Sequence, residues 1–180
     1  DEERREEALQ IRKDLGIDPL APVFLFVGKL EPIKQPIELA ESFASLDATA
    51  HLIYVGSGVL EIELKERFDS NPNIHFVGFQ NQSIIPIWYR VGNVLCLPSK
   101  SETWGLAVNE ALACGCSVIV SDRVGCADDL VKGREHGVVF RWNNNQSLHK
   151  ALEDGLSSQV VRRIDIQVAD LTDFAAALIQ

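Results

Sequence analysis

Short runs of apolar residues recur along the chain, and each is followed by a polar or glycine-rich segment. These runs occupy residues 23–27, 51–55, 74–77, 93–97, 117–120 and 137–140. Nearly every position in them is apolar, whereas a strand with one face in water alternates between apolar and polar residues. Strands of this kind need both faces covered, which helices on either side of a parallel sheet provide. The pattern therefore predicts an α/β fold, with a doubly wound, mainly parallel sheet of about six strands and helices on both faces.

Segments with apolar residues at helical spacing separate these runs. Near the N-terminus, Ala8, Ile11, Arg12 and Leu15 form one such stripe, which Gly16 closes. We expect further helices to begin at Pro36, to end near Phe68, and to span about 83–90, 106–113, 127–131 and 146–154. The segment 162–180 has the pattern of one or two additional helices.

Composition and charge limit the classes of protein to consider. The chain has 180 residues, 46% of them hydrophobic. A single domain of this size buries about 70% of its unfolded surface. The formal net charge of −9 argues against nucleic acid and against anionic lipid, because both require a basic face. We therefore expect no nucleic-acid partner and no direct membrane contact from this domain, and any anionic ligand must be held by a local group of positive charges.

The sequence also bears on compartment and metal content. It has no signal peptide and no apolar run of transmembrane length. Its four cysteines lie in apolar or glycine-rich surroundings, which suggests reduced thiols. Cys114 and Cys116 lack the further paired ligands of a zinc site. We expect a cytoplasmic protein without a bound metal, and a peripheral membrane association of the full-length protein stays open.

Two carboxylates flank the junction between the apolar run at 93–97 and the helix expected at 106–113. Glu102 and Glu110 are separated by seven residues, and Gly105 stands where the helix begins. Free N–H groups at a helix N-terminus attract anions, and a glycine lets a ligand approach the backbone closely. Eight helical positions span roughly 12 Å. This spacing fits a nucleotide diphosphate sugar gripped at both ends, with its pyrophosphate over the start of the helix.

Other candidates follow the earlier strands, because ligands of doubly wound sheets bind outside the carboxyl ends of the strands. After the first run, Gly28, Lys29 and Lys34 form a candidate phosphate cradle, or else two solvated lysines on a loop. Ser57 follows the second run, where it either faces phosphate or sugar or simply belongs to a turn that ends the strand.

Aromatic and acidic side chains complete the set of candidates. Phe79 and Gln80 follow the run at 74–77 and are candidates for framing a base. Trp104 either walls the sugar or packs against the protein. Glu110 lies in an otherwise apolar helix, where a carboxylate is costly unless it has polar partners, and ribose hydroxyls would serve as such partners. The four histidines share no metal spacing or triad context, so we expect structural roles for them.

Taken in order, these segments resemble the donor-binding, C-terminal domain of glycosyltransferase family four, the glycosyl transferases group 1, which are retaining enzymes of GT-B fold. The resemblance covers about residues 22–152, and its most specific element is the pair Glu102 and Glu110. It is supported by the segments F-V-G-K-L-E-P-I-K, Y-V-G-S-G, I-H-F-V-G-F and S-D-R-V-G-C-A-D-D-L-V. The chain departs from the family where Lys29 replaces the usual arginine and Gln35 the usual glycine.

The resemblance implies transfer of a sugar from a nucleotide diphosphate sugar to an acceptor hydroxyl, with retention at the anomeric carbon. Lys29 and Lys34 would stabilise the departing diphosphate. Glu102 would hold sugar hydroxyls near the reacting carbon, and Glu110 would bind the ribose. The other donor-binding residues that the match implies are Gly28, Ser57, Phe79, Gln80, Ser99, Thr103, Trp104, Gly105 and Leu106. No metal or other cofactor is implied, because lysines and a helix N-terminus take its place.

Enzymes of this family have two such domains, and the N-terminal one holds the acceptor. The chain contains no methionine and opens with the charged run 1–7. We therefore interpret residues 1–180 as a single nucleotide-sugar-binding domain excised from the C-terminal part of a two-domain enzyme. With its N-terminal partner missing, the domain is expected to bind donor weakly and to transfer little or nothing.

Two alternative functions use the same fold. One is a nucleotide-sugar epimerase of GT-B type, and the other is a non-catalytic nucleotide-sugar-binding module. A dinucleotide-dependent oxidoreductase is disfavoured because G-x-G-x-x-G is absent after the first strand, where the chain reads Gly28-Lys29-Leu30. The sequence leaves open the nucleotide (UDP, GDP or ADP), the sugar and the acceptor.

Overall fold

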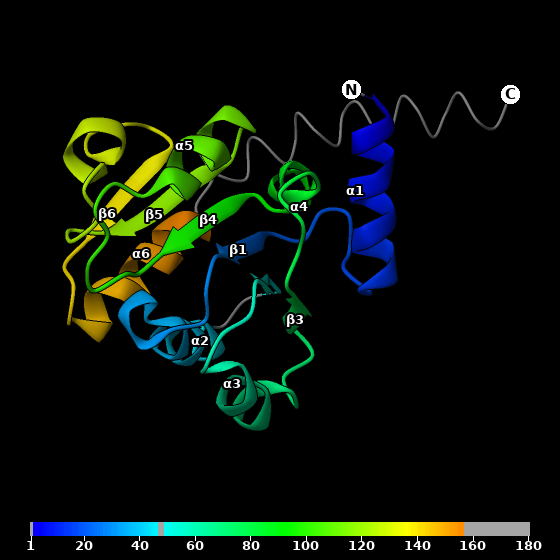
Figure 1. Cartoon of the computed structure of the whole chain (residues 1–180), viewed down its shortest axis with the longest axis horizontal. Helices are drawn as coiled ribbons and strands as arrows, with labels where there is room; N and C mark the ends of the chain where they lie inside the picture. Colours follow the sequence, from blue (N-terminus) through cyan, green and yellow to red (C-terminus); the bar gives the residue numbers. More distant parts are fainter. Residues whose placement is uncertain (1, 47–48, 157–180) are drawn as a thin grey trace, which may run out of the picture.

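The structure, a computed structural model, describes residues 2–46 and 49–156. Its centre is a six-stranded sheet in the order β3-β2-β1-β4-β5-β6, with every pairing parallel. The strands are β1 (Val23–Val27), β2 (His51–Val55), β3 (Ile74–Gly78), β4 (Val94–Leu97), β5 (Ser117–Ser121) and β6 (Gly137–Phe140). Helices cover both faces of the sheet (Figure 1), so the predicted doubly wound α/β fold is confirmed. The helices predicted within 162–180 lie outside the described residues.

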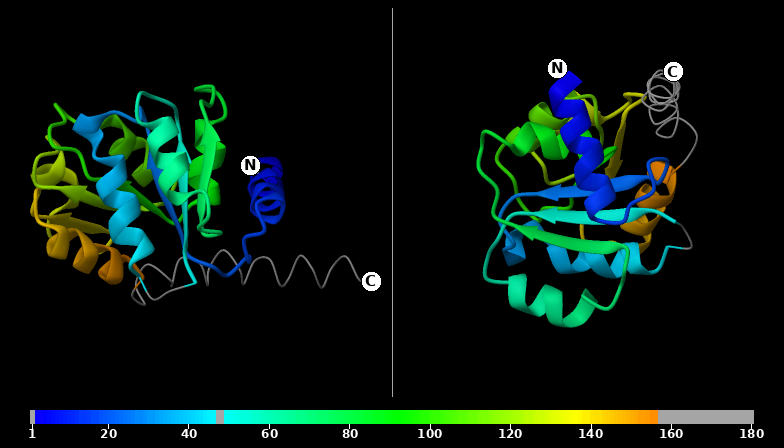
Figure 2. Two further views of the ribbon diagram at one scale, coloured as in Figure 1. Left: turned by 90° about the horizontal axis from the view of Figure 1, so that it is seen from below. Right: turned by 90° about the vertical axis from the view of Figure 1, so that its right-hand side faces the viewer.

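Helices connect the strands, as the apolar spacing predicted. Within the described ranges they are α1 (Glu2–Asp14), α2 (Pro36–Ala44), α3 (Glu61–Phe68), α4 (Ile85–Val91), α5 (Leu106–Ala113) and α6 (Asn145–Leu156), with a 3₁₀ turn η1 (Pro32–Lys34) and a short π-helical segment η2 (Ala127–Val131). One face of the sheet carries α2, α3 and α6, and the other carries α1, α4 and α5 (Figure 2). Among the described residues, no helix combines the length and the apolar character needed to cross a bilayer.

The sheet separates two apolar cores. In β1, Phe24 and Phe26 pack with α2, α3 and α6, whereas Val23 and Leu25 belong to the core under α1, α4 and α5. All four side chains are fully buried. Because successive residues of a strand face opposite sides of the sheet, a strand covered on both faces needs an apolar residue at every position. This requirement explains the unbroken apolar runs in the sequence.

A buried arginine, which the sequence pattern placed within an apolar stripe, holds α1 to the sheet. Arg12 donates through Nε to Val91 O at 2.8 Å and through Nη2 to Asn93 Oδ1 at 2.9 Å. The same Asn93 oxygen accepts Val23 N at 2.8 Å. Burial lowers the pKa of Arg12 to about 10, which leaves the guanidinium protonated at neutral pH. These bonds fix the amino ends of β1 and β4 side by side.

The order of the strands reverses between β1 and β4. From β1 the chain builds outward through β2 to β3, then returns to place β4 on the other side of β1 and continues to β5 and β6. The loops that leave β1 and β4 therefore diverge, at the point where doubly wound sheets bind their ligands. Neighbouring loops approach closely on this edge: Gly56 has a φ of 143°, and a Cβ on it would lie 1.9 Å from Gly28 O.

Candidate functional site at the carboxyl edge of the sheet

A pocket of about 340 Å³ opens at the reversal of strand order. It lies between Val27, the last residue of β1, and Leu97, the last residue of β4. Its other lining residues are Lys34, Glu102, Thr103, Trp104, Gly105, Leu106 and Ala107. The structure thus brings six of the candidate residues named from the sequence around one cavity.

The start of α5 forms one wall of this pocket. Gly105 precedes the helix with a φ of 99°, and a Cβ on it would lie 2.9 Å from Val124 Cγ1, so the tight turn favours glycine. The preceding loop is fixed by a bridge to the next loop, in which Glu102 N donates to Arg123 O at 3.2 Å. The first N–H groups of a helix have no intrahelical acceptor. The exposed Leu106 end of α5 therefore offers backbone donors to an anion in the pocket.

Lys34 and Glu102 form an ion pair inside the pocket. Lys34 Nζ donates to Glu102 Oε2, and the two side chains are 23% and 21% exposed. Lys34 ends η1, which follows β1, whereas Glu102 lies in the loop after β4. The pair therefore joins the two loops that flank the pocket. An ammonium group has three N–H donors, so Lys34 is positioned by Glu102 and keeps donors for an anionic ligand.

The loop that carries Gly28 and Lys29 lies at the same edge of the sheet. Gly28 N donates to Val55 O at 3.0 Å, which ties this loop to β2. The Lys29 side chain is 78% exposed, and its Nζ lies 3.9 Å from Glu31 Oε1. Of the two candidate lysines, Lys34 lines the pocket and Lys29 stands outside its lining.

Glu110 is partly buried on α5 and receives two hydrogen bonds. Tyr89 Oη donates to Glu110 Oε2 at 2.9 Å, and Gln82 Nε2 donates to Oε1 at 3.4 Å. Tyr89 is itself 1% exposed, and its burial, together with the nearby charge of Glu110, raises its pKa well above the ordinary value, so the hydroxyl stays a donor. The sequence indicated that this carboxylate needs polar partners, but it did not identify these two. A tyrosine in the apolar stripe of α4 has the pattern of a core residue.

The candidates after β2 and β3 lie on the side of β1 away from β4. Phe79 is 74% exposed, and Gln80 Nε2 donates to Val77 O at 2.9 Å. Ser57 is partly buried, and its backbone oxygen accepts Leu30 N at 3.0 Å. None of Ser57, Phe79 and Gln80 lines the pocket. A ligand that reached Phe79 from the pocket would have to extend across the ends of β1 and β2.

The loop after β4 contributes an exposed wall and a buried serine. Trp104 is 41% exposed, and its Nε1 donates to Asn109 Oδ1 at 2.8 Å. Thr103 stands beside it, also exposed. Ser99 is fully buried; its Oγ has no hydrogen-bond partner in the described part of the chain, and its backbone oxygen accepts Ser121 Oγ at 2.6 Å. Trp104 and Thr103 are therefore accessible to a ligand, whereas Ser99 is not.

Two protein groups in the pocket can face an anion. Lys34 carries a full charge, which is paired with that of Glu102, and the N-terminus of α5 adds the partial positive charge of a helix end. Over residues 2–46 and 49–156, no group of three or more His, Cys, Asp or Glu side chains is arranged to hold a metal ion. A diphosphate is the kind of anion that such a combination of lysine and backbone donors can bind.

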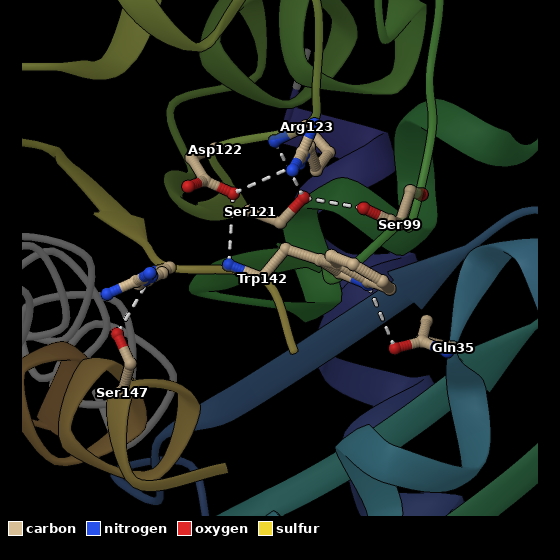
Figure 3. A network of polar contacts seen from close by, with 8 residues as sticks. Gln35, Ser99, Ser121, Asp122, Arg123, Trp142 and Ser147 are labelled. Atoms are coloured by element: carbon tan, nitrogen blue, oxygen red, sulfur yellow. Dashed lines mark hydrogen bonds and ion pairs between the residues drawn. The ribbon is translucent and has the colours of Figure 1, made fainter. Parts of the chain in front are cut away.

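A network that the sequence did not predict joins the loop after β6 to the loop after β1 (Figure 3). Trp142 Nε1 donates to Gln35 Oε1 at 3.2 Å, and Trp142 N donates to Asp122 Oδ1 at 3.0 Å. Gln35 has a left-handed φ of 56°, at the position where the resemblance drawn from the sequence implies a glycine. Because Gln35 directly follows Lys34, the network holds the backbone that carries the lysine of the pocket. In the sequence, a glutamine at position 35 in place of the expected glycine was the available indication of this network.

The family of the chain follows from a match that spans most of its length. A model of the glycosyl transferases group 1 matches residues 7–168. The chain belongs to this family, which confirms the resemblance drawn from its motifs. Among curated relatives, D-inositol 3-phosphate glycosyltransferase 2 of Catenulispora acidiphila is 32% identical over 143 residues, which cover 71% of this chain and 34% of that protein. The chain thus spans about a third of the length of the curated relatives it matches.

Solved structures of other proteins share the fold. Anabaena HepE in complex with UDP and glucose superposes with a TM-score of 0.72 at 18% identity, over 93% of this chain and 52% of that one. The C-terminal domain of the group 1 family protein LpcC from Francisella tularensis superposes with a TM-score of 0.71 at 21% identity, over 94% of this chain and 91% of that one. The described fold therefore corresponds to a unit that is named a C-terminal domain in another protein of the family.

Proposed function

We propose that this chain is the donor-binding domain of a retaining glycosyltransferase and that it binds a nucleotide diphosphate sugar in the pocket between β1 and β4. The main observation behind the proposal is that Lys34, Glu102 and the start of α5 line one cavity at the carboxyl edge of the sheet. The complex of HepE with UDP and glucose supports it, because that protein has the same fold. Membership of the glycosyl transferases group 1 supports a transferase rather than another nucleotide-sugar enzyme.

The diphosphate would lie over the start of α5, within reach of the backbone N–H groups of Gly105 and Leu106. Negative charge grows on the leaving diphosphate as the glycosidic bond breaks, and donors aimed at that charge lower the barrier. Lys34 is held at this place by Glu102, while Lys29 is exposed and would have to turn inward from the loop after β1. No metal ion is needed in this proposal, because lysine and helix N-terminus supply the positive charge.

The two glutamates would hold the sugar and the ribose of the donor. Glu102 lies in the pocket and would accept hydrogen bonds from sugar hydroxyls near the anomeric carbon. Glu110 would accept hydrogen bonds from the ribose, with Tyr89 and Gln82 fixing the orientation of its carboxylate. Phe79 and Gln80, at the end of β3, would frame the base. The donor would thus extend along the carboxyl edge of the sheet, with its sugar near β4 and its base near β3, across the reversal of strand order.

A second domain would hold the acceptor. Support comes from the coverage of the relatives, of which this chain matches about a third. Further support comes from the match to an isolated C-terminal domain of a family member. By this proposal the chain presents an open donor site and, by itself, transfers little or no sugar.

Titration of the chain with UDP, GDP and ADP in the presence of a metal chelator tests the proposal. We expect at least one of the three to bind without added divalent ion. Lys34→Gln should weaken that binding, whereas the matched change Lys132→Gln, at an exposed lysine paired with Asp128, should leave it unchanged. Absence of binding by all three at millimolar concentration, or strict dependence on magnesium, would refute the metal-free donor site.

A further inference from the structure

A second group of cations lies at the same edge of the sheet, beyond the donor pocket. Trp142 follows β6, and its ring centroid lies 5.8 Å from Lys100 Nζ and 5.6 Å from Arg123 Cζ. Arg141 is the preceding residue and is exposed. We call Lys100, Arg123, Arg141 and Trp142 the Trp142 patch. Two cations lie over one indole ring and a third, Arg141, is exposed on the preceding residue, in a chain whose formal net charge is −9.

The acidic residue beside this patch is already engaged. Asp122 Oδ1 accepts the backbone N–H of Trp142 at 3.0 Å and lies 4.0 Å from Arg123 Nε (Figure 3). The three cations of the patch and the one carboxylate of Asp122 together carry a formal charge of about +2. Such an excess attracts an anion, and arginine is suited to phosphate because its guanidinium presents two parallel N–H donors.

The patch borders a cavity. A pocket of about 390 Å³ is lined by Asp122, Arg123, Arg141, Trp142, Asn143 and Asn144. Pockets for small molecules have volumes of about 300–1,000 Å³, so this one has room for more than a lone ion. Asn143 has a left-handed φ of 54°, and Asn144 Oδ1 accepts Ser147 N at 2.8 Å, so the turn that carries the pocket wall is tied to the start of α6.

Two hydrogen bonds connect the Trp142 patch with the donor pocket, one between backbone groups and one between side chains. Glu102 N donates to Arg123 O at 3.2 Å, so the loop with the pocket carboxylate lies against the loop with the patch arginine. Trp142 Nε1 donates to Gln35, the residue after Lys34. A ligand seated on the patch would therefore lie next to the ion pair of the donor pocket.

We propose that the Trp142 patch binds the phosphate group of a phosphorylated saccharide, with Arg123 and Arg141 pairing with the phosphate and the Trp142 ring packing against the sugar. This inference rests on the proposed function and adds to it a class of acceptor, namely one that carries a phosphate. The hydroxyl to be glycosylated would still be positioned by the second domain. The patch would hold the anionic end of the same molecule beside the donor.

Calorimetric titration at low salt with glucose 6-phosphate, glucose and inorganic phosphate tests the patch. We expect glucose 6-phosphate to bind more tightly than inorganic phosphate, and glucose not to bind. The double change Arg123→Gln and Arg141→Gln should weaken glucose 6-phosphate by about tenfold or more, the effect of losing hydrogen bonds between charged groups. The matched double change Arg67→Gln and Arg134→Gln, on α3 and before β6, should leave it unchanged.

Titration with UDP on the same samples separates this inference from the proposed function. Normal binding of UDP without binding of glucose 6-phosphate at millimolar concentration would overturn the patch and leave the donor site intact. Equal binding of glucose 6-phosphate by the wild type and the patch variant would also overturn it, as would inorganic phosphate binding as tightly as the sugar phosphate. Arg123→Gln and Arg141→Gln, each made alone at an exposed position, repeat the comparison with less effect on folding.

Discussion

The ion pair between Lys34 and Glu102 links two residues that sequence reasoning had assigned to different parts of the donor. Each side chain is mostly buried and is held by the other. Removal of one partner leaves the second charge partly desolvated and unpaired, which costs more than the pair itself contributes. Substitutions at either position therefore disturb both the positive and the negative side of the pocket.

The two glutamates should differ in what their loss affects. Glu110→Gln should weaken UDP and UDP-sugar alike, by about 1–3 kcal/mol as for a hydrogen bond to a charged group. Glu102→Gln, in a full-length enzyme, should reduce turnover more than it reduces UDP affinity, because Glu102 lies beside the reacting carbon in the proposed complex. Calorimetry and initial rates measure the two effects. Glu153→Gln, on α6, is the matched control, and equal effects of both changes on both quantities would contradict the assigned roles.

A pair of histidines lies at the opposite, amino edge of the sheet. His51 starts β2 and His75 lies in β3, with Nδ1 and Nε2 3.0 Å apart and the rings stacked at 5.2 Å. Burial lowers the pKa of both, with Arg12 acting further on His51 and His51 acting further on His75. The structural role expected for these residues thus consists of two neutral rings in contact.

Stability should therefore depend on pH below neutrality. Because the folded pKa values lie below 6.5, the unfolded chain binds more protons in the window just under that value. The contribution of the pair is complete above pH 6.5 and declines as the pH falls through the unfolded pKa toward the folded one. Urea unfolding between pH 5 and 8 should show this decline. This decline in stability should be smaller in His51→Gln and His75→Gln, and it should persist in His136→Gln. An unchanged dependence of stability on pH in the His51 and His75 variants would show that these two histidines do not cause it.

At the scale of elements, strands were easier to predict than the contacts between their loops. Burial on both faces imposes an unbroken apolar run, so β1 and β2 were found at their actual bounds. The contact between Trp142 and Gln35 joins positions 107 apart and leaves no local pattern. The spacing of Glu102 and Glu110 indicated the loop and helix that border the pocket, whereas the apolar neighbours of Tyr89 in α4 gave no sign of its contact with Glu110.

The contact between Trp142 and Gln35 leads to a prediction about the loop after β1. Gln35 has a left-handed backbone, which costs a non-glycine residue about 1–3 kcal/mol. Its side chain offsets that cost by accepting from Trp142 and donating to Glu38 Oε1 at 3.1 Å. Gln35→Ala loses both bonds and keeps the strained backbone, so we expect it to destabilise the fold by about 1–2 kcal/mol. Gln35→Gly also relieves the strain and should cost less.

Urea unfolding of the two variants provides the measurement. Gln146→Ala, at an exposed position of α6, serves as the control for loss of a glutamine side chain. Equal destabilisation by glycine and alanine would mean that the left-handed backbone of Gln35 carries no strain. UDP affinity should fall in both variants, since each loosens the backbone next to Lys34.

At the scale of the whole molecule, the proposed two-domain mechanism makes turnover a property of the longer protein. Closure of a second domain positions the acceptor, a contribution of about 7–11 kcal/mol, and excludes water from the reacting groups. We expect this chain to fold and bind nucleotide, with transferase activity several orders of magnitude below that of a two-domain parent. Donor turnover by both proteins at equal concentration is the measurement, and comparable rates would refute the need for a second domain.

The reversal of strand order between β1 and β4 also determines when the pocket comes into existence during folding. Strands β1 to β3 come from the first half of the chain and β4 to β6 from the second, and the two halves meet where Phe24 and Leu25 pair with Val94 and Leu95. Neither half alone contains the whole pocket, since Lys34 belongs to the first and Glu102 to the second. A nucleotide bound there would stabilise only conformations in which the halves have joined. Bound ligand should therefore protect the pairing of β1 with β4 from proteolysis more than it protects the outer strands. The donor would then stabilise the middle of the sheet by joining its two halves.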